Sequence, residues 1–189
     1  TMNLIIGDYD LPRHNVLLIS CIDLRLSDEL AAFMDADNLT NRYDHLVLAG
    51  TSIGVFQTKP QDLSASWLIT LKSHVKISVD LHEPHDIYLV EHRNCGAYKA
   101  FLDDFDDTDE ENEKDEHTRW AAKLKLLLEQ WWVEFDPKDK HGKAIPLHVH
   151  GFLMDLRGDV EVLNLGNQTK QSSQSKTTAA KKTRKTKGA

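Results

Sequence analysis

The chain has 189 residues, of which 40% are hydrophobic and 28% charged, and its formal net charge is −7. This is the size and composition of one globular domain with a hydrophobic core. No apolar run approaches the length of a membrane span and no secretory leader is evident, so we expect a cytoplasmic protein without a membrane span. The acidic balance argues against a nucleic-acid-binding surface.

The predicted elements begin with a short apolar run at residues 16–20, which indicates a buried strand that ends at Cys21. A second apolar run at 46–49 predicts another strand, followed by Gly50. Leucine, tryptophan and valine residues at steps of four then predict an amphipathic helix over 63–79. A third strand is expected at 87–90, just before His92.

The second half of the chain starts with a predicted helix after Cys95. An apolar stripe over 120–135 predicts a longer helix, and runs at 147–153 and 160–165 predict two more strands. Strands that alternate with helices indicate an α/β domain with a mainly parallel central sheet flanked by helices.

Charge is unevenly distributed along the sequence. Residues 103–116 hold ten acids and one lysine, so we expect a solvated acidic loop at 103–117 rather than a calcium site, whose glycine and ligand spacing are absent. Residues 166–189 hold seven basic residues, no acid and almost no large apolar side chain. We therefore expect a folded α/β domain over 1–165 and a disordered basic tail over 166–189.

Two cysteines and one histidine stand out as candidate metal ligands. Cys21 and His92 both follow predicted strands, at the sheet edge where open α/β folds place their sites, and Cys95 lies three residues after His92. Two thiolates and an imidazole suit zinc, and a set of three protein ligands leaves one position open, as in catalytic zinc sites. In a cytosolic chain, metal ligation is favoured over a disulfide.

Asp23 and Arg25 follow Cys21 by two and four residues. A bidentate pair with Arg25 would keep Asp23 ionised, and a carboxylate beside the metal either binds it or hydrogen-bonds to its fourth ligand. An ordinary salt bridge in a loop is the alternative.

These segments resemble the motifs of the β-class carbonic anhydrases, in the same order along the chain. The matching segments are Cys21-Ile-Asp-Leu-Arg25, Ala49-Gly50, His92-Arg-Asn-Cys95-Gly96 and residues 149–155. The resemblance implies an α/β fold like that of the β-carbonic anhydrases and one Zn²⁺ per chain held by Cys21, His92 and Cys95. It also implies a homodimer or a multiple of dimers.

The activity that the resemblance implies is the reversible hydration of carbon dioxide to bicarbonate by a zinc-bound hydroxide, as in a lyase. Asp23 and Arg25 would be catalytic. The residues expected to border the substrate are Ala49, Gly50, Thr51 and Gly96. Two alternatives stay open: a zinc hydrolase acting on carbonyl sulfide or carbon disulfide, and a non-catalytic scaffold or bicarbonate-sensing module.

The sequence departs from the family pattern at Glu91, where glycine usually precedes the histidine, and at Thr51, where asparagine is common. Alternation along the strand predicts that Glu91 points away from the metal. His148 and His150 are expected to be core or interface residues rather than a second metal site. Five other histidines are expected at the surface: His74, His82, His85, His117 and His141.

Overall fold

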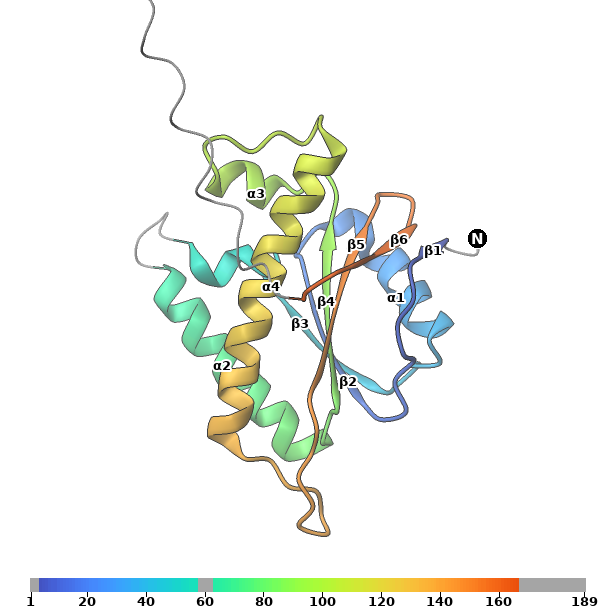
Figure 1. Cartoon of the computed structure of the whole chain (residues 1–189), viewed down its shortest axis with the longest axis vertical. Helices are drawn as coiled ribbons and strands as arrows, with labels where there is room; N and C mark the ends of the chain where they lie inside the picture. Colours follow the sequence, from blue (N-terminus) through green and yellow to red (C-terminus); the bar gives the residue numbers. More distant parts are fainter. Residues whose placement is uncertain (1–3, 58–62, 167–189) are drawn as a thin grey trace, which may run out of the picture.

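The computed structural model describes residues 4–57 and 63–166, so the predicted basic tail beyond residue 166 lies outside the described residues. A single mixed sheet forms the centre of the fold (Figure 1). Its strands are β1 (Ile5–Ile6), β2 (Val16–Ser20), β3 (Tyr43–Val47), β4 (Asp86–His92), β5 (His148–Met154) and β6 (Val160–Leu163). They are arranged in the order β1-β6-β5-β4-β2-β3, and only the β5–β6 pair is antiparallel.

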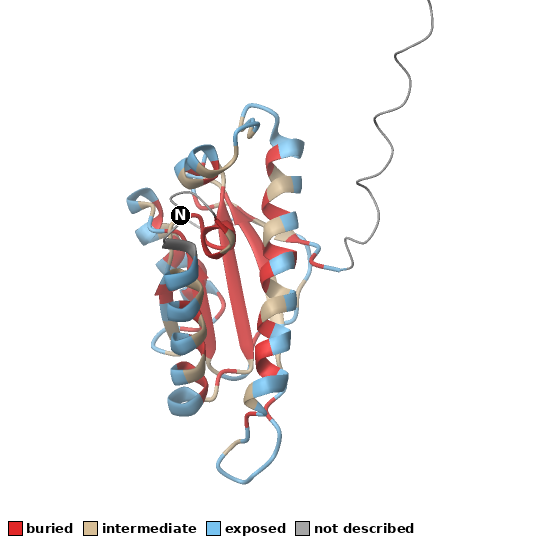
Figure 2. Cartoon of the chain, turned by 90° about the vertical axis from the view of Figure 1, so that its left-hand side faces the viewer, coloured by how far each residue is buried: buried red, intermediate tan, exposed pale blue. Residues whose placement is uncertain are grey.

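Helices cover both faces of this sheet (Figure 1). The helical segments are η1 (Leu24–Leu26), α1 (Ser27–Ala36), η2 (Ile53–Phe56), α2 (Leu63–His82), α3 (Gly96–Phe101) and α4 (Glu110–Phe135). Helices α2 and α4 pack on one face, and α1 packs on the other. Figure 2 shows their buried residues turned toward the sheet and their exposed residues turned outward. No helix within the described ranges has the length and apolar character needed to cross a membrane.

The alternation of side chains along the strands divides the core between the two faces. On β4, Ile87 and Leu89 pack with α2 and α4, whereas Tyr88 and Val90 pack with α1. All seven residues of β4 are buried, because the strand is central and both its faces are covered.

The predicted α/β fold with a mainly parallel sheet is confirmed. The strand expected at 46–49 lies instead at Tyr43–Val47, because its pairing with β2 runs from Val16↔Tyr43 to Ser20↔Val47. Strand β1 and helix α1 were not predicted. Helix α1 nevertheless carries a buried set, Leu30, Phe33 and Met34, at the spacing typical of a helix.

The acidic segment is only partly a loop, because α4 begins at Glu110. Asp109 caps this helix by accepting hydrogen bonds from the backbone N–H groups of Glu111 and Asn112, at 3.2 Å each. Acidic residues in the first turn also interact favourably with the helix dipole. Glu113 and His117 are buried at 1% and 0% exposure, so the prediction that His117 lies at the surface is wrong.

Of the paired histidines of β5, His148 is exposed and is therefore not a core residue, whereas His150 is half-buried. The ring of His150 lies 2.9 Å from a carboxylate oxygen of Asp86 on neighbouring β4. Within residues 4–57 and 63–166, neither His148 nor His150 belongs to a group of donors close enough to hold a metal ion.

Candidate metal centre

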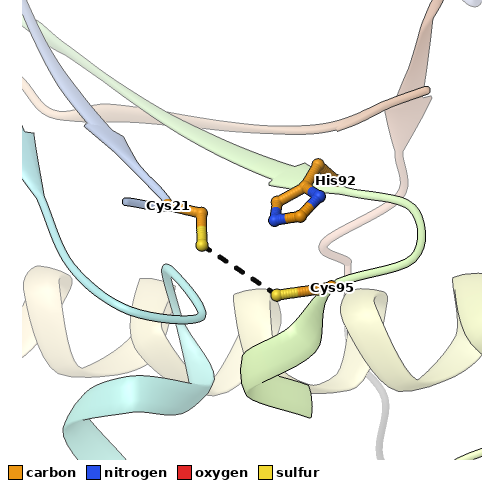
Figure 3. A group of neighbouring side chains, drawn as sticks. All are labelled: Cys21, His92 and Cys95. Atoms are coloured by element: carbon orange, nitrogen blue, oxygen red, sulfur yellow. Dashed lines mark hydrogen bonds between the residues drawn. The ribbon is translucent and has the colours of Figure 1, made fainter. Parts of the chain in front are cut away.

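Three side chains from two distant segments of the sequence meet at the carboxyl edge of the sheet (Figure 3). Strands β2 and β4 are parallel neighbours with Ser20 paired to Val90, so both end at the same edge. Cys21 directly follows β2, His92 is the last residue of β4, and Cys95 is the N-cap residue of α3. The topology of the sheet therefore brings the two sequence motifs together.

The donor atoms of these residues are close enough to bind one ion. The two Sγ atoms and the imidazole nitrogen lie within 4.8 Å of one another, and the two Sγ atoms are 4.0 Å apart. Two thiolates on one tetrahedral zinc ion, each at ~2.3 Å, lie about 3.8 Å apart. All three residues are buried, with exposures of 7%, 1% and 1% for Cys21, His92 and Cys95. The arrangement thus fits a borderline-soft divalent cation such as zinc.

The ring of His92 is oriented for metal binding. Its Nδ1 lies 2.9 Å from the carbonyl oxygen of Arg93. A carbonyl only accepts hydrogen bonds, so Nδ1 carries the proton and Nε2 has a free lone pair. That Nε2 atom is buried and has no hydrogen-bond partner among the described residues. A backbone partner on the distal ring nitrogen is the usual support for a metal-binding histidine.

The two thiols have strongly coupled acidities. A hydrogen bond from the Cys95 thiol lowers the pKa of Cys21 to about 4. Burial of Cys21 opposes this shift. His92 and the backbone N–H group of Gly50, which lies 3.3 Å from the Cys21 sulfur, lower the pKa further. The same hydrogen bond, together with burial and the negative charge on Cys21, raises the pKa of Cys95. One thiolate therefore forms easily and two only with difficulty, unless a cation compensates the second charge.

Asp23 and Arg25 lie beside the three candidate ligands as an ion pair. Arg25 donates from Nε and Nη2 to the two carboxylate oxygens, at 2.8 and 2.6 Å. These hydrogen bonds from Arg25 lower the pKa of Asp23 to about 2. Asp23 Oδ2 is 3.8 Å from His92 Nε2. An ionised carboxylate is therefore held next to the position where a metal would bind.

The residues expected to border a substrate lie on two loops at this edge. Gly50 contacts Cys21 through its N–H group, and Ala49 precedes it in the same loop. Gly96 is exposed at the start of α3. Thr51 is fully buried, and its hydroxyl donates to the carbonyl oxygen of Val90 at 3.1 Å. The threonine side chain thus ties the loop to β4.

Glu91 forms a buried polar cluster behind the candidate ligands. Its carboxylate accepts hydrogen bonds from the Ser52 N–H group and the Tyr98 hydroxyl, and it contacts His117 Nδ1, each at 3.1 Å. These partners come from the N-cap of η2, from α3 and from α4, so Glu91 lies on the α4 face of β4, as the alternation of the strand predicts. The sequence pattern does not reveal the cluster, because Ser52, Tyr98 and His117 lie 39, 7 and 26 residues from Glu91.

The fold and the site together define an α/β protein with a candidate metal centre of the three-ligand type. Residues 12–134 match the family described as "Putative carbonic anhydrase". A protein of Rickettsia bellii, named only as uncharacterized, is 31% identical over 147 residues, which cover 78% of this chain and 80% of that protein. The chain belongs to this carbonic anhydrase family.

Solved structures of carbonic anhydrases are also among the proteins to which the chain is similar. The enzyme of Streptococcus mutans is 17% identical, with a TM-score of 0.46 and a coverage of 84% of this chain and 88% of that chain. The β-carbonic anhydrase CafA of Aspergillus fumigatus is 16% identical, with a TM-score of 0.47 and a coverage of 82% and 77%. Family membership rests on the sequence match.

Proposed function

We propose that Cys21, His92 and Cys95 bind one zinc ion and that the protein catalyses the reversible hydration of carbon dioxide to bicarbonate. The observation that carries this proposal is the meeting of two thiol groups and one imidazole nitrogen within 4.8 Å at the carboxyl edge of the sheet. Family membership supports the same chemistry. A bound zinc ion would act as a Lewis acid that lowers the pKa of water toward ~7.

The role proposed for Asp23 is to orient the attacking oxygen. Its pKa of about 2 makes the carboxylate a poor proton acceptor at neutral pH, so it does not fit the role of a general base. A carboxylate still has lone pairs free when an arginine occupies both its oxygens. Asp23 can therefore accept a hydrogen bond from the nucleophile and direct a lone pair toward carbon, while Arg25 fixes the position of Asp23.

We propose that Ala49, Gly50 and Gly96 border the substrate, while the buried Thr51 holds the loop of Ala49 and Gly50 against β4. Gly50 also contributes to the centre itself, because its N–H group stabilises the Cys21 thiolate. No side chain is needed as a covalent nucleophile, since both thiols are assigned to the metal.

The residues of the site also suggest how the protein assembles and where in the cell it is found. The apolar side chains of Ile22 and Leu24, on either side of Asp23, are 63% and 86% exposed. We propose that a second copy of the chain covers them in a homodimer or a multiple of dimers. We also propose a cytoplasmic location, because two free cysteines 4.0 Å apart stay reduced most readily there.

The test combines metal analysis with stopped-flow measurement of carbon dioxide hydration. We expect about one zinc per chain and turnover in the purified protein. Asp23→Ala should keep its zinc and lose at least ~100-fold in kcat, which is within the range for loss of a positioned catalytic group. The matched control is Asp28→Ala, which removes an exposed carboxylate of α1 and should leave kcat unchanged.

Three results would contradict the proposal. A protein without stoichiometric zinc would remove its basis. A zinc-loaded protein that hydrolyses carbonyl sulfide or carbon disulfide but does not hydrate carbon dioxide would replace the substrate. A zinc-loaded protein inactive on all three substrates would indicate a scaffold or a bicarbonate-sensing module.

A further inference from the structure

The turn between His92 and Cys95 is held from both sides at one residue, Asn94. The backbone N–H group of Asn94 donates to Glu113 Oε1 at 2.6 Å. The carbonyl oxygen of Asn94 accepts a hydrogen bond from Arg25 Nη2 at 3.3 Å. Asn94 also has a left-handed backbone conformation, with a φ angle of 57°. Side chains from outside the turn therefore stabilise a conformation that residues other than glycine adopt only uncommonly.

Glu113 is the buried member of the acidic segment. It is 1% exposed, whereas the other nine acids of 103–116 are exposed or half-buried. Its Oε1 bonds to Asn94, and its Oε2 lies 3.1 Å from Arg93 Nη1, which also donates to the carbonyl oxygen of Glu110 at 3.0 Å. A buried carboxylate is unfavourable unless it is paired, and both oxygens of Glu113 are used on the turn that carries the candidate ligands.

Arg93 connects its contact with Glu113 to His92 and Cys95, the two candidate ligands of the turn. Its backbone N–H group donates to the carbonyl oxygen of Met154 on β5 at 2.9 Å, and its own carbonyl oxygen accepts the proton of His92 Nδ1. Cys95 follows one residue after Asn94. The position of the Arg93–Asn94 segment therefore sets both the orientation of the His92 ring and the place where Cys95 enters α3.

We infer that Glu113 is a positioning residue for the metal centre: through Asn94 and Arg93, α4 fixes the spacing between His92 and Cys95. Glu113 does not belong to the group of donors that can hold the ion, so it acts through the turn. Its link to catalysis, through Asn94 and Arg25 to Asp23, rests on the function proposed above. Its effect on metal affinity does not depend on which reaction the centre performs.

The test measures zinc affinity by competition with a chelating dye, using the full chain. Removing an outer hydrogen-bond partner of a metal site typically lowers affinity 10–100-fold. We expect a loss of that size for Glu113→Ala. The loss of zinc affinity should be smaller for Glu113→Gln. Its amide oxygen can still accept a hydrogen bond from the Asn94 N–H group, although the negative charge facing Arg93 is gone. Glu111→Gln, which removes an exposed charge from the same helical turn, should stay within twofold of the unchanged protein.

A spectroscopic measurement separates positioning from general destabilisation. The cobalt-substituted protein should show altered sulfur-to-cobalt charge-transfer bands in both Glu113 variants and unaltered bands in Glu111→Gln. If Glu113→Ala does not fold, Glu113→Gln provides the same readouts. Zinc affinity within twofold of the unchanged protein in the folded Glu113 variants, with the same cobalt spectrum, would overturn the inference. A zinc-loaded wild-type protein without carbon dioxide turnover would overturn the proposed function and leave this inference standing.

Discussion

Replacing Glu91 with alanine should destabilise the protein more than most single substitutions. The Glu91 side chain is 1% exposed, and it is the common partner of Ser52, Tyr98 and His117. Removing it leaves the Ser52 N–H group and the His117 ring buried without a partner, while the Tyr98 hydroxyl can rotate. It also leaves a cavity where η2, α3 and α4 meet.

The expected cost follows from these lost contacts. Each buried donor left unpaired costs about 1–3 kcal/mol, so the Ser52 and His117 groups together with the cavity give a loss on the order of 3–5 kcal/mol. Glu91→Gln keeps the shape and one acceptor oxygen and should cost about 1–2 kcal/mol. Domains are stable by only about 5–15 kcal/mol, so the alanine variant should lose a large fraction of its free energy of unfolding.

The assay is urea unfolding followed by tryptophan fluorescence, with Glu111→Ala as the control that removes an exposed carboxylate. The unfolding midpoint should fall steeply for Glu91→Ala, moderately for Glu91→Gln and hardly at all for the control. A loss below about 1 kcal/mol for Glu91→Ala, with an unchanged slope of free energy against urea, would refute the view that this cluster stabilises the fold.

Two other substitutions test the loops of the site. Arg25→Ala should move acid unfolding to higher pH. The pKa of Asp23 is about 2 in the folded protein, which is below its value in the unfolded chain. The ionised Asp23 therefore stabilises the fold fully above pH ~4, and this stabilisation is lost as the pH falls toward 2. Circular dichroism against pH measures this, and an unchanged acid midpoint would contradict it. Gly54→Ala should cost about 1–3 kcal/mol, because the new Cβ would lie 2.3 Å from the carbonyl oxygen of Ala49. Gly96→Ala is the matched control, since its Cβ would meet nothing within 4 Å, and equal thermal unfolding temperatures for the two would argue against the steric effect.

The sequence predicts an element reliably where its pattern of apolar residues fits only one kind of secondary structure. The apolar run 16–20 and the run before His92 indicated strands that end at the same edge, and parallel pairing of β2 with β4 brings Cys21 and His92 together. The pairing itself was not in the sequence pattern, because it depends on which strands become neighbours. Strand β1 has only two residues and leaves almost no signal.

Glu113 and His117 are hard to recognise as buried residues because the composition and the periodicity of their segment predict different structures. Ten acids in a short segment indicate a solvated loop, yet Glu113, His117 and Ala121 recur at steps of four and continue the buried stripe of α4. Polar residues at core positions of a helical stripe indicate a buried network rather than a solvated surface. The partners of that network, Asn94 and Glu91, come from distant segments, so only the fold could identify them.

Glu91 and His92 are neighbours on β4, so their side chains point to opposite faces of the strand. One side chain faces the helices and the other faces the thiols, and β4 is held in register on both sides, at Val90 with Ser20 and at His92 with Met154. Deleting one residue from this strand would exchange the two faces, bringing a carboxylate toward the sulfurs and an imidazole toward α4. The length of β4 is therefore constrained as strongly as the identities of Glu91 and His92.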